Sequence, residues 1–284
     1  MSSILTATIV LGLLALLAAV ILYVCSKKFA VYEDPRIAQV SECLPGANCG
    51  GCGYAGCNAL ADALVKSADA GSIEGLTCPV GGSSVMSAIA DVLGISVTDT
   101  DEKVAVVRCQ GSCEMREHVV SYDGLHTCTA MHATGMGETA CGYGCLGCGD
   151  CVEACAFGAL SMNQETGLPE VNEERCTACG ACVKACPRHV IELRLKGIKS
   201  RRVYVGCVNK DKGPDAKKAC KKACIGCSLC QKECKFEAIT IANNLSYIDD
   251  KKCRLCRKCE QVCPTHAIVA VNFPLRKTEK EVSE

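Results

Sequence analysis

The longest uninterrupted apolar segment lies at the start of the chain, where residues 4–24 read ILTATIVLGLLALLAAVILYV without a charge. At about 1.5 Å of rise per residue, a helix of this length measures about 31 Å, enough to cross the hydrocarbon layer of a bilayer. No basic residue precedes the run, the run is too long for the core of a signal peptide, and no small-residue cleavage site follows it. The pattern therefore favours an uncleaved membrane anchor over residues 1–28 rather than a signal peptide.

Shorter hydrophobic patterns divide the rest of the chain into small helices and hairpins. From Ala55 onward apolar residues recur at helical spacing, so that Leu60, Leu64 and Val65 share one face. Later in the chain, QETG separates ALSM from LPEV, and ANN separates AITI from LSYI, which is typical of two short β-hairpins. The chain is therefore expected to belong to the α+β class and to consist of several small units.

The composition limits how such units are held together. The chain of 284 residues contains 28 Cys, no Trp and only 4 Phe, so a large aromatic core is not expected. In a short secreted chain this cysteine content would indicate a disulfide scaffold. Here the chain is longer and its cysteines are clustered, which indicates that something other than side-chain packing helps to hold the fold.

The charges beside the apolar segment predict where the cysteines lie. Lys27 and Lys28 follow the segment directly, and no positive charge precedes it. Under the positive-inside rule, residues 29–284 then lie on the cytoplasmic side of the cell membrane, attached by a single span. Because the cytoplasm is reducing, a disulfide framework is improbable and the cysteines need another use.

Most of the cysteines form four repeats of the pattern C-x2-C-x2-C-x3-C. The quartets are Cys145, Cys148, Cys151 and Cys155; Cys176, Cys179, Cys182 and Cys186; Cys224, Cys227, Cys230 and Cys234; and Cys253, Cys256, Cys259 and Cys263. Structural zinc normally takes two C-x2-C knuckles separated by a longer segment, which fits this spacing poorly. Three thiols in steps of three residues fit a 4Fe-4S cubane, whose fourth iron takes a cysteine from elsewhere. The spacing therefore favours iron–sulfur clusters over zinc.

In two-cluster proteins with this motif, the fourth cysteine of each quartet serves the other cluster. The predicted ligand sets are Cys145, Cys148 and Cys151 with Cys186; Cys176, Cys179 and Cys182 with Cys155; Cys224, Cys227 and Cys230 with Cys263; and Cys253, Cys256 and Cys259 with Cys234. Pro187 and Pro264 follow one fourth cysteine of each pair, as the bacterial motif prefers. Ala156 and Lys235 follow the other two, which weakens the match but removes no ligand.

A separate cysteine group lies closer to the apolar segment. Cys49, Cys52 and Cys57 are spaced C-x2-C-x4-C, and Cys78 follows 21 residues later. Glycines among them allow the backbone to fold tightly around an inorganic core, and the N-terminus of the predicted helix favours thiolate charge. These four residues are predicted to bind a fifth 4Fe-4S cluster, and a zinc knuckle is the alternative. Cys43 lies near the group and is a weaker candidate.

The remaining cysteines have no recognisable spacing. Cys109, Cys113, Cys128 and Cys141 either bind a sixth cluster, which we favour slightly, or are buried thiols that support the fold. Cys207 and Cys220 have no obvious partners in the sequence. Cys25, at the end of the apolar segment, is either an ordinary interfacial residue or a palmitoylation site.

A formal net charge of zero hides an asymmetry between the two parts of the chain. Residues 1–193 carry 10 Lys and Arg against 21 Asp and Glu, whereas residues 194–284 carry 21 against 10. The basic part suits docking of a small acidic electron carrier, and a solvated face is the alternative. The candidate contacts within residues 194–258 are Lys217, Lys218, Lys221, Lys222, Arg254, Arg257 and Lys258.

The sequence gives no sign of a catalytic apparatus. No G-x-G-x-x-G motif follows a predicted strand and there is no P-loop, so the chain alone is not expected to hold NAD or flavin. The five histidines have no acid–base partners nearby in the sequence. Tyr204 is the single aromatic residue in the basic stretch 194–222, which argues against a nucleic-acid partner.

Two resemblances follow from these motifs. Residues 141–193 and 220–272 each resemble a two-cluster bacterial ferredoxin. The succession of the apolar segment, LPGANCGGCGYAGC and CGYGCLGCGDCVEACAFGAL closely resembles the RnfB family, the B subunits of the membrane-bound Rnf ferredoxin–NAD oxidoreductases, which pump sodium ions or protons. The likeness covers nearly the whole chain, and residues 207–272 look like the extra domain of the longer, clostridial-type members. It implies that reduced ferredoxin donates electrons to the chain, which relays them to other subunits of a membrane translocase.

The motifs divide the chain into successive segments. These are a transmembrane anchor (1–28), a 4Fe-4S domain (29–95), a cysteine-containing connecting region (96–140), two ferredoxin-like domains (141–193 and 220–272) joined by a basic linker (194–219), and a polar tail (273–284). Two other functions stay open: an iron–sulfur module for redox sensing or structure, and the electron-feeding subunit of a hydrogenase or formate dehydrogenase. Rapid reduction by reduced ferredoxin distinguishes a relay from a sensor.

Overall fold

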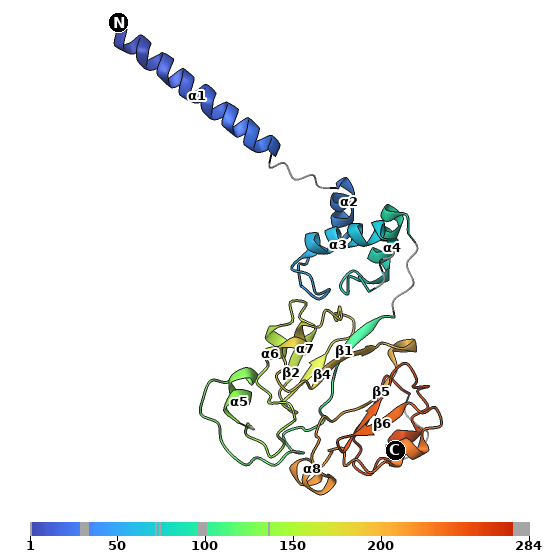
Figure 1. Ribbon diagram of the computed structural model, residues 1–284. Coiled ribbons are helices and arrows are strands. Elements are labelled where there is room, and N and C mark those ends of the chain that lie inside the picture. Colours follow the sequence, from blue (N-terminus) through green and yellow to red (C-terminus); the bar gives the residue numbers. More distant parts are fainter. Residues whose placement is uncertain are drawn as a thin grey trace.

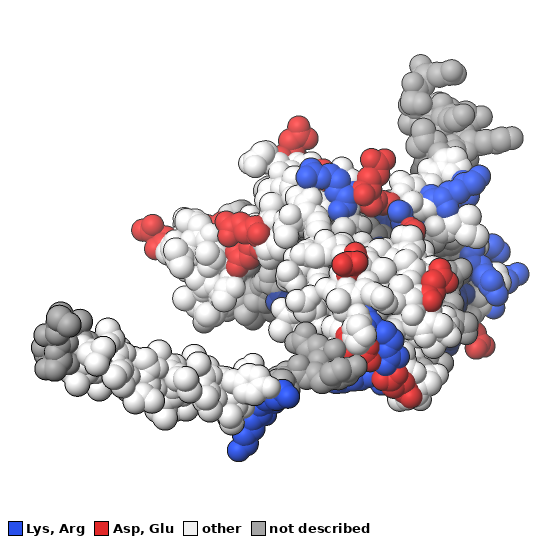
Figure 2. All heavy atoms as spheres, turned by 90° about the horizontal axis from the view of Figure 1, so that it is seen from above, with Lys and Arg blue, Asp and Glu red and all other residues white. Residues whose placement is uncertain are grey.

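The apolar helix stands apart from the rest of the molecule (Figure 1). The structure is a computed structural model that describes residues 2–28, 34–71, 73, 75–95, 101–135 and 137–274. Helix α1, Ser2–Lys28, carries no charge before Lys27 and Lys28 in its last turn, and basic side chains mark that end in Figure 2. Within the described ranges, α1 is the one helix long and apolar enough to cross a membrane, with a mean hydropathy of 2.8.

A small helical domain comes next in the chain. Its helices are α2 (Pro35–Cys43), α3 (Cys57–Asp69) and α4 (Gly82–Leu93). Leu60, Leu64 and Val65 are buried, which confirms the helical face that the sequence predicts. They share a core with Val40 of α2 and Met86 of α4, so the loop that carries the first cysteine group rests on a packed three-helix base.

The first ferredoxin-like unit consists of two antiparallel strand pairs and short helices. Its elements are β1 (Lys103–Val107), α5 (Cys128–Thr134), α6 (Asp150–Glu153), β2 (Leu160–Asn163), β3 (Leu168–Val171), α7 (Ala181–Ala185) and β4 (Ile191–Leu195). Strand β2 pairs with β3, as the sequence predicts for this hairpin. Strand β1 pairs with β4 in the register Lys103↔Leu195, so the segment before the cysteine quartets completes this unit.

The second ferredoxin-like unit repeats this arrangement. Its elements are the 3-10 turn η1 (Ile198–Ser200), β5 (Arg202–Val205), α8 (Gly213–Ala219), α9 (Leu229–Glu233), β6 (Ile239–Ala242), β7 (Leu245–Ile248), α10 (Lys258–Gln261) and β8 (Ile268–Val271). The predicted hairpin is confirmed as β6 and β7. Strand β5 pairs with β8 in the register Arg202↔Val271, so residues 194–219, expected to be a linker, instead contain a strand of this unit. The α+β class is confirmed.

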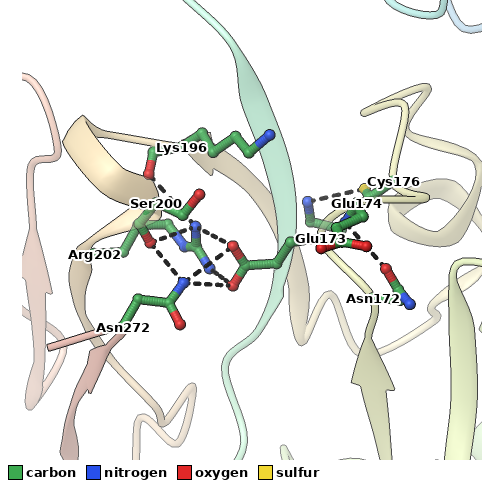
Figure 3. Close-up of polar contacts among 9 residues, drawn as sticks. Asn172, Glu173, Glu174, Cys176, Lys196, Ser200, Arg202 and Asn272 are labelled. Carbon is green, nitrogen blue, oxygen red and sulfur yellow. Dashed lines mark hydrogen bonds and ion pairs between the residues drawn. The ribbon is translucent and has the colours of Figure 1, made fainter.

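A buried ion pair joins the two units (Figure 3). Arg202 of β5 donates from Nη1 to Oε2 of Glu173, which follows β3, at 3.1 Å, and its Nη2 contacts the other oxygen. Asn272 donates to both oxygens of the same carboxylate at 3.2 Å. The Arg202 side chain is 6% exposed and that of Glu173 is 22% exposed, so this pair is largely removed from solvent.

A second buried arginine fixes the same interface. Arg194 of β4 is 2% exposed, donates to the carbonyl oxygen of Ile248 and lies 5.1 Å from the ring centroid of Tyr247. Beside it, the Leu195 N–H donates to Oδ2 of Asp250 at 2.9 Å. The orientation of one ferredoxin-like unit on the other is therefore set by polar contacts from β4 and β5.

Candidate metal centres

The four quartets surround four pockets, which we name after one cysteine of each. The Cys145 pocket is lined by Cys145, Cys151 and Cys186 together with Cys128; the Cys176 pocket by Cys155, Cys176, Cys179 and Cys182; the Cys224 pocket by Cys224, Cys227, Cys230 and Cys263; and the Cys253 pocket by Cys234, Cys253, Cys256 and Cys259. Their volumes lie between about 290 and 370 Å³. In each, one thiol comes from the partner quartet.

The backbone bends around each pocket in the same way. On both sides of the second cysteine of every quartet the chain adopts left-handed conformation, with φ between 55° and 89°. The residues are Gly147 and Gly149, Ala178 and Gly180, Gly226 and Ser228, and Leu255 and Arg257. Alternation of right- and left-handed residues turns successive backbone N–H groups toward one concave side, which favours an anionic group there.

Backbone amides also point at individual thiols. Ala105 donates its N–H to Sγ of Cys176 at 3.5 Å, and Ala159 donates to Sγ of Cys155 at 3.3 Å. In the second unit Ala267 donates to Sγ of Cys263 at 3.3 Å. Such bonds stabilise thiolates, the form that binds iron, and influence the reduction potential of a bound cluster.

Burial has the opposite effect on the free thiols. It raises the pKa of Cys145, Cys151 and Cys259 to about 12, because desolvation disfavours the thiolate. Binding of a metal therefore has to displace protons from these sites, and the favourable metal–sulfur bonds compensate for that displacement.

The thiols surround space rather than a point. In the described part of the chain, no three side chains of His, Cys, Asp or Glu lie close enough to share a single metal ion, and this includes the four quartets. A single zinc ion needs four ligands within about 2.3 Å of one centre. The donor set of four thiols around a pocket fits a polynuclear iron–sulfur cluster better.

Cys128 lies at the Cys145 pocket, away from the cysteines with which the sequence analysis groups it. Thr127 caps α5, and the Asp150 carboxylate accepts the N–H of Cys128 at 2.7 Å, which holds this thiol beside the first quartet. The pKa of Cys148 is raised to about 12 by burial and by the neighbouring Cys128. Five thiols are therefore gathered here, where the sequence predicts four.

The helical domain gathers the first cysteine group. Burial raises the pKa of Cys78, and the nearby Cys57 and Cys49 raise it further, so these three thiols lie close to one another. The Gly81 N–H donates to Sγ of Cys78 at 3.4 Å. Cys52 packs with Cys57 against the same hydrophobic core, as does Cys43.

A further pocket lies where the two ferredoxin-like units meet. It has a volume of about 330 Å³ and is lined by Cys109, Cys141, Cys207 and Cys220, and we call it the Cys109 pocket. Cys113, in contrast, is exposed and contacts the carbonyl oxygen of Thr166 at 3.6 Å. The structure thus does not bring Cys109, Cys113, Cys128 and Cys141 together as one set. It joins two of them to Cys207 and Cys220, which the sequence leaves without partners.

The sites form one series of neighbours. Cys224 and Cys259 share a core in the second unit, and Cys145 and Cys182 share one in the first. The Cys109 pocket touches both units, because the Cys145 N–H donates to Sγ of Cys109 at 3.5 Å and Ala223, next to Cys224, lines it. At the other end, Gly51 of the helical domain lies against the backbone of Cys179.

Family models match both kinds of cysteine region. Residues 144–209 and 223–268 match the model described as "4Fe-4S dicluster domain". Residues 44–70 match the model described as "Putative Fe-S cluster". These matches and the thiol pockets together indicate that the chain binds 4Fe-4S clusters.

Three relatives resemble the chain over most of its length, and each is named as the B subunit of a membrane complex. That of the ion-translocating oxidoreductase complex of Methanosarcina acetivorans is 42% identical over 94% of this chain and 99% of the relative. That of the Na(+)-translocating ferredoxin:NAD(+) oxidoreductase complex of Acetobacterium woodii is 44% identical over 91% of this chain and 75% of the relative. That of the proton-translocating ferredoxin:NAD(+) oxidoreductase complex of Clostridium ljungdahlii is 38% identical, covering 95% and 94%.

Proposed function

Because the chain belongs to the RnfB family, the B subunits of ion-translocating oxidoreductase complexes, we propose that it receives electrons from reduced ferredoxin and relays them to other subunits of a membrane-bound Rnf complex. The observation that carries this proposal is the unbroken series of thiol sites from the Cys253 pocket to the helical domain. A series of this kind is what a relay needs, since electron transfer between two centres falls steeply with their separation.

The proposal assigns five 4Fe-4S clusters to the predicted ligand sets. Each bound cluster supplies a one-electron carrier. The sets are Cys49, Cys52, Cys57 and Cys78; Cys145, Cys148, Cys151 and Cys186; Cys155, Cys176, Cys179 and Cys182; Cys224, Cys227, Cys230 and Cys263; and Cys234, Cys253, Cys256 and Cys259. The similar pocket volumes and the N–H groups directed at sulfur support these sets.

The Cys253 pocket is the proposed entry site. Cys256 is exposed, and Phe236, which lines the same pocket, is 45% exposed, so a partner can approach this thiol closely. Exposed Arg254 and Lys258 also line the pocket, and blue side chains gather on the side of the body far from the apolar helix in Figure 2. Ferredoxins of the acidic type complement this charge, which raises the rate of encounter.

Not every basic candidate faces a docking partner. Lys222 lines the Cys109 pocket and is only partly exposed. Arg257 pairs with Glu260 at 2.7 Å and lies 4.9 Å from the ring centroid of Phe273. The proposed contact surface is therefore carried by Arg254 and Lys258, with the exposed Lys251 and Lys252 beside them, whereas Lys217, Lys218 and Lys221 lie on and after α8.

The helical domain is the proposed exit toward the membrane. Its cysteine loop touches the Cys176 pocket through Gly51, and the same domain follows the apolar helix in the chain. Membrane association is supported by α1 and by the membrane-complex relatives. Lys27 and Lys28 support a cytoplasmic position for the bulk of the chain under the positive-inside rule. Protease added outside intact cells is then expected to leave residues 34–274 uncut.

Stopped-flow mixing of the anaerobically purified full chain with reduced ferredoxin tests the proposal. The expected result is rapid bleaching of the iron–sulfur absorbance. Clusters that stay oxidised in the presence of reduced ferredoxin, while dithionite still reduces them, would contradict it.

A further inference from the structure

We propose that Cys109, Cys141, Cys207 and Cys220 hold a sixth 4Fe-4S cluster, which connects the two ferredoxin-like units. This inference rests on the proposed relay function and specifies how the relay crosses the unit interface. The four cysteines come from four separate segments: the ends of β1 and β5, the loop before the first quartet, and the end of α8.

The first argument is the size and lining of the Cys109 pocket. Its volume of about 330 Å³ falls within the range of the four quartet pockets. A β-carbon built on Gly144 would lie 3.3 Å from Sγ of Cys141 and 3.7 Å from Sγ of Cys109, so both sulfurs stand beside the same point on the wall. Space for a side chain is absent there, and the backbone of Gly144 forms that part of the wall.

The second argument is the set of N–H donors aimed at the sulfurs. The Cys145 N–H donates to Sγ of Cys109 and the Asn209 N–H donates to Sγ of Cys207, both at 3.5 Å. The side-chain amide of Asn209 donates to Sγ of Cys141 at 3.6 Å, although this residue is 1% exposed. A buried polar amide directed at a sulfur fits a site that carries negative charge on its sulfurs.

The third argument is buried positive charge. Arg108 and Arg116 line the pocket and are 8% and 9% exposed. Arg108 is paired with Glu192 at 3.1 Å, but Nε of Arg116 is buried and has no hydrogen-bond partner. A buried cation is costly unless an anion compensates for it. Neutral thiols cannot do so, whereas a thiolate-bound cubane is anionic.

The position of the pocket gives the site its role. On one side it adjoins the Cys145 pocket through the bond from Cys145 to Cys109, and on the other it adjoins the Cys224 pocket through Ala223. A centre here shortens the step between the two ferredoxin-like units. The six sites then form one path from the basic entry to the helical domain.

Anaerobic iron and acid-labile sulfide analysis of the full chain tests the inference. We expect about 24 irons per chain, at four per cluster, and about 20 would overturn the sixth site. Double substitution C207S/C220S is expected to remove about four irons, whereas the control Cys113→Ser, at an exposed thiol outside the pockets, is expected to remove none. An iron content unchanged by C207S/C220S would also overturn the inference.

A second variant keeps the test valid if the double variant folds poorly. Asn209→Leu retains all four ligands and removes one donor to sulfur. We expect full iron content with a shifted reduction potential for one cluster, measured by redox titration with EPR detection. No shifted signal would contradict the assignment of Asn209 to this site. If the parent chain holds about 24 irons but reduced ferredoxin leaves them oxidised, the proposed relay fails while the sixth site stands; about 20 irons that bleach rapidly give the opposite result.

Discussion

Gly51 lies directly against the backbone of Cys179. A β-carbon built on Gly51 would stand 2.7 Å from the Cys179 carbonyl oxygen and 3.0 Å from its Cα and Cβ, closer than atoms of this kind approach one another. The cysteine loop of the helical domain therefore touches the cysteine loop of the first ferredoxin-like unit through bare backbone. A side chain at this position has to separate the two loops.

We expect Gly51→Ala to leave the iron content unchanged and to slow electron arrival at the helical domain several-fold. The reason is that the added methyl group increases the separation between the two sites. Freeze-quench EPR after mixing with reduced ferredoxin measures this step. Ala47→Val adds bulk to the same loop at an exposed position and serves as the control. Equal rates in both variants would contradict the contact as an electron path.

The ion pair between the units predicts a stability difference between adjacent glutamates. Removing one partner of a buried pair costs about 3–5 kcal/mol, and the partial exposure of Glu173 reduces the expected loss to about 2 kcal/mol. Glu173→Ala is therefore expected to unfold at a lower urea concentration than the parent under anaerobic conditions. Glu174→Ala, at the exposed neighbouring position, is expected to match the parent. Indistinguishable midpoints for the two variants would rule out a stabilising role for the pair.

Charge at the Cys253 pocket is expected to control the rate of electron entry. The rate with acidic ferredoxin should fall as ionic strength rises, because salt screens exposed charges. Arg254→Glu with Lys252→Glu is expected to lower the second-order rate constant about tenfold at low salt and to flatten its salt dependence. Lys184→Glu, an exposed reversal in the first unit, is the control. A parent rate that stays flat or rises with added salt refutes docking by charge.

The turn after the fourth cysteine predicts a stabilising substitution. Gly158 in the first unit and Glu237 in the second occupy equivalent left-handed positions, with φ of 56° and 51°. A left-handed conformation costs a non-glycine residue about 1–2 kcal/mol. Glu237→Gly is therefore expected to slow cluster loss in urea, corresponding to about 1 kcal/mol. Lys235→Gly, two residues earlier at a position without positive φ, should give no such gain, and a gain of equal size there would contradict the explanation.

Local spacing was sufficient to predict the quartets. Cys145, Cys148 and Cys151 lie within seven residues, so the chain can bring them together through one loop and one helical turn. The face of Leu60 and Leu64 was also predictable, because a helical period is visible in any short window.

The thiol set of the Cys109 pocket was not predictable, because its members are distant in sequence. Cys207 reaches Cys109 only after β1 pairs with β4 and β5 pairs with β8. Strand β5 itself gave no signal, since all four of its residues are buried and the alternation of polar and apolar positions is lost. A connecting region and a linker in the sequence are therefore parts of the two units.

The central claim is that these thiols hold iron cubanes that exchange electrons with ferredoxin. A reductive titration of the anaerobic full chain with reduced ferredoxin, combined with metal analysis of the same sample, tests it most directly. The account predicts about one electron taken up per four irons, with zinc absent. Zinc in place of iron, or iron centres that take up no electrons from ferredoxin, would contradict it.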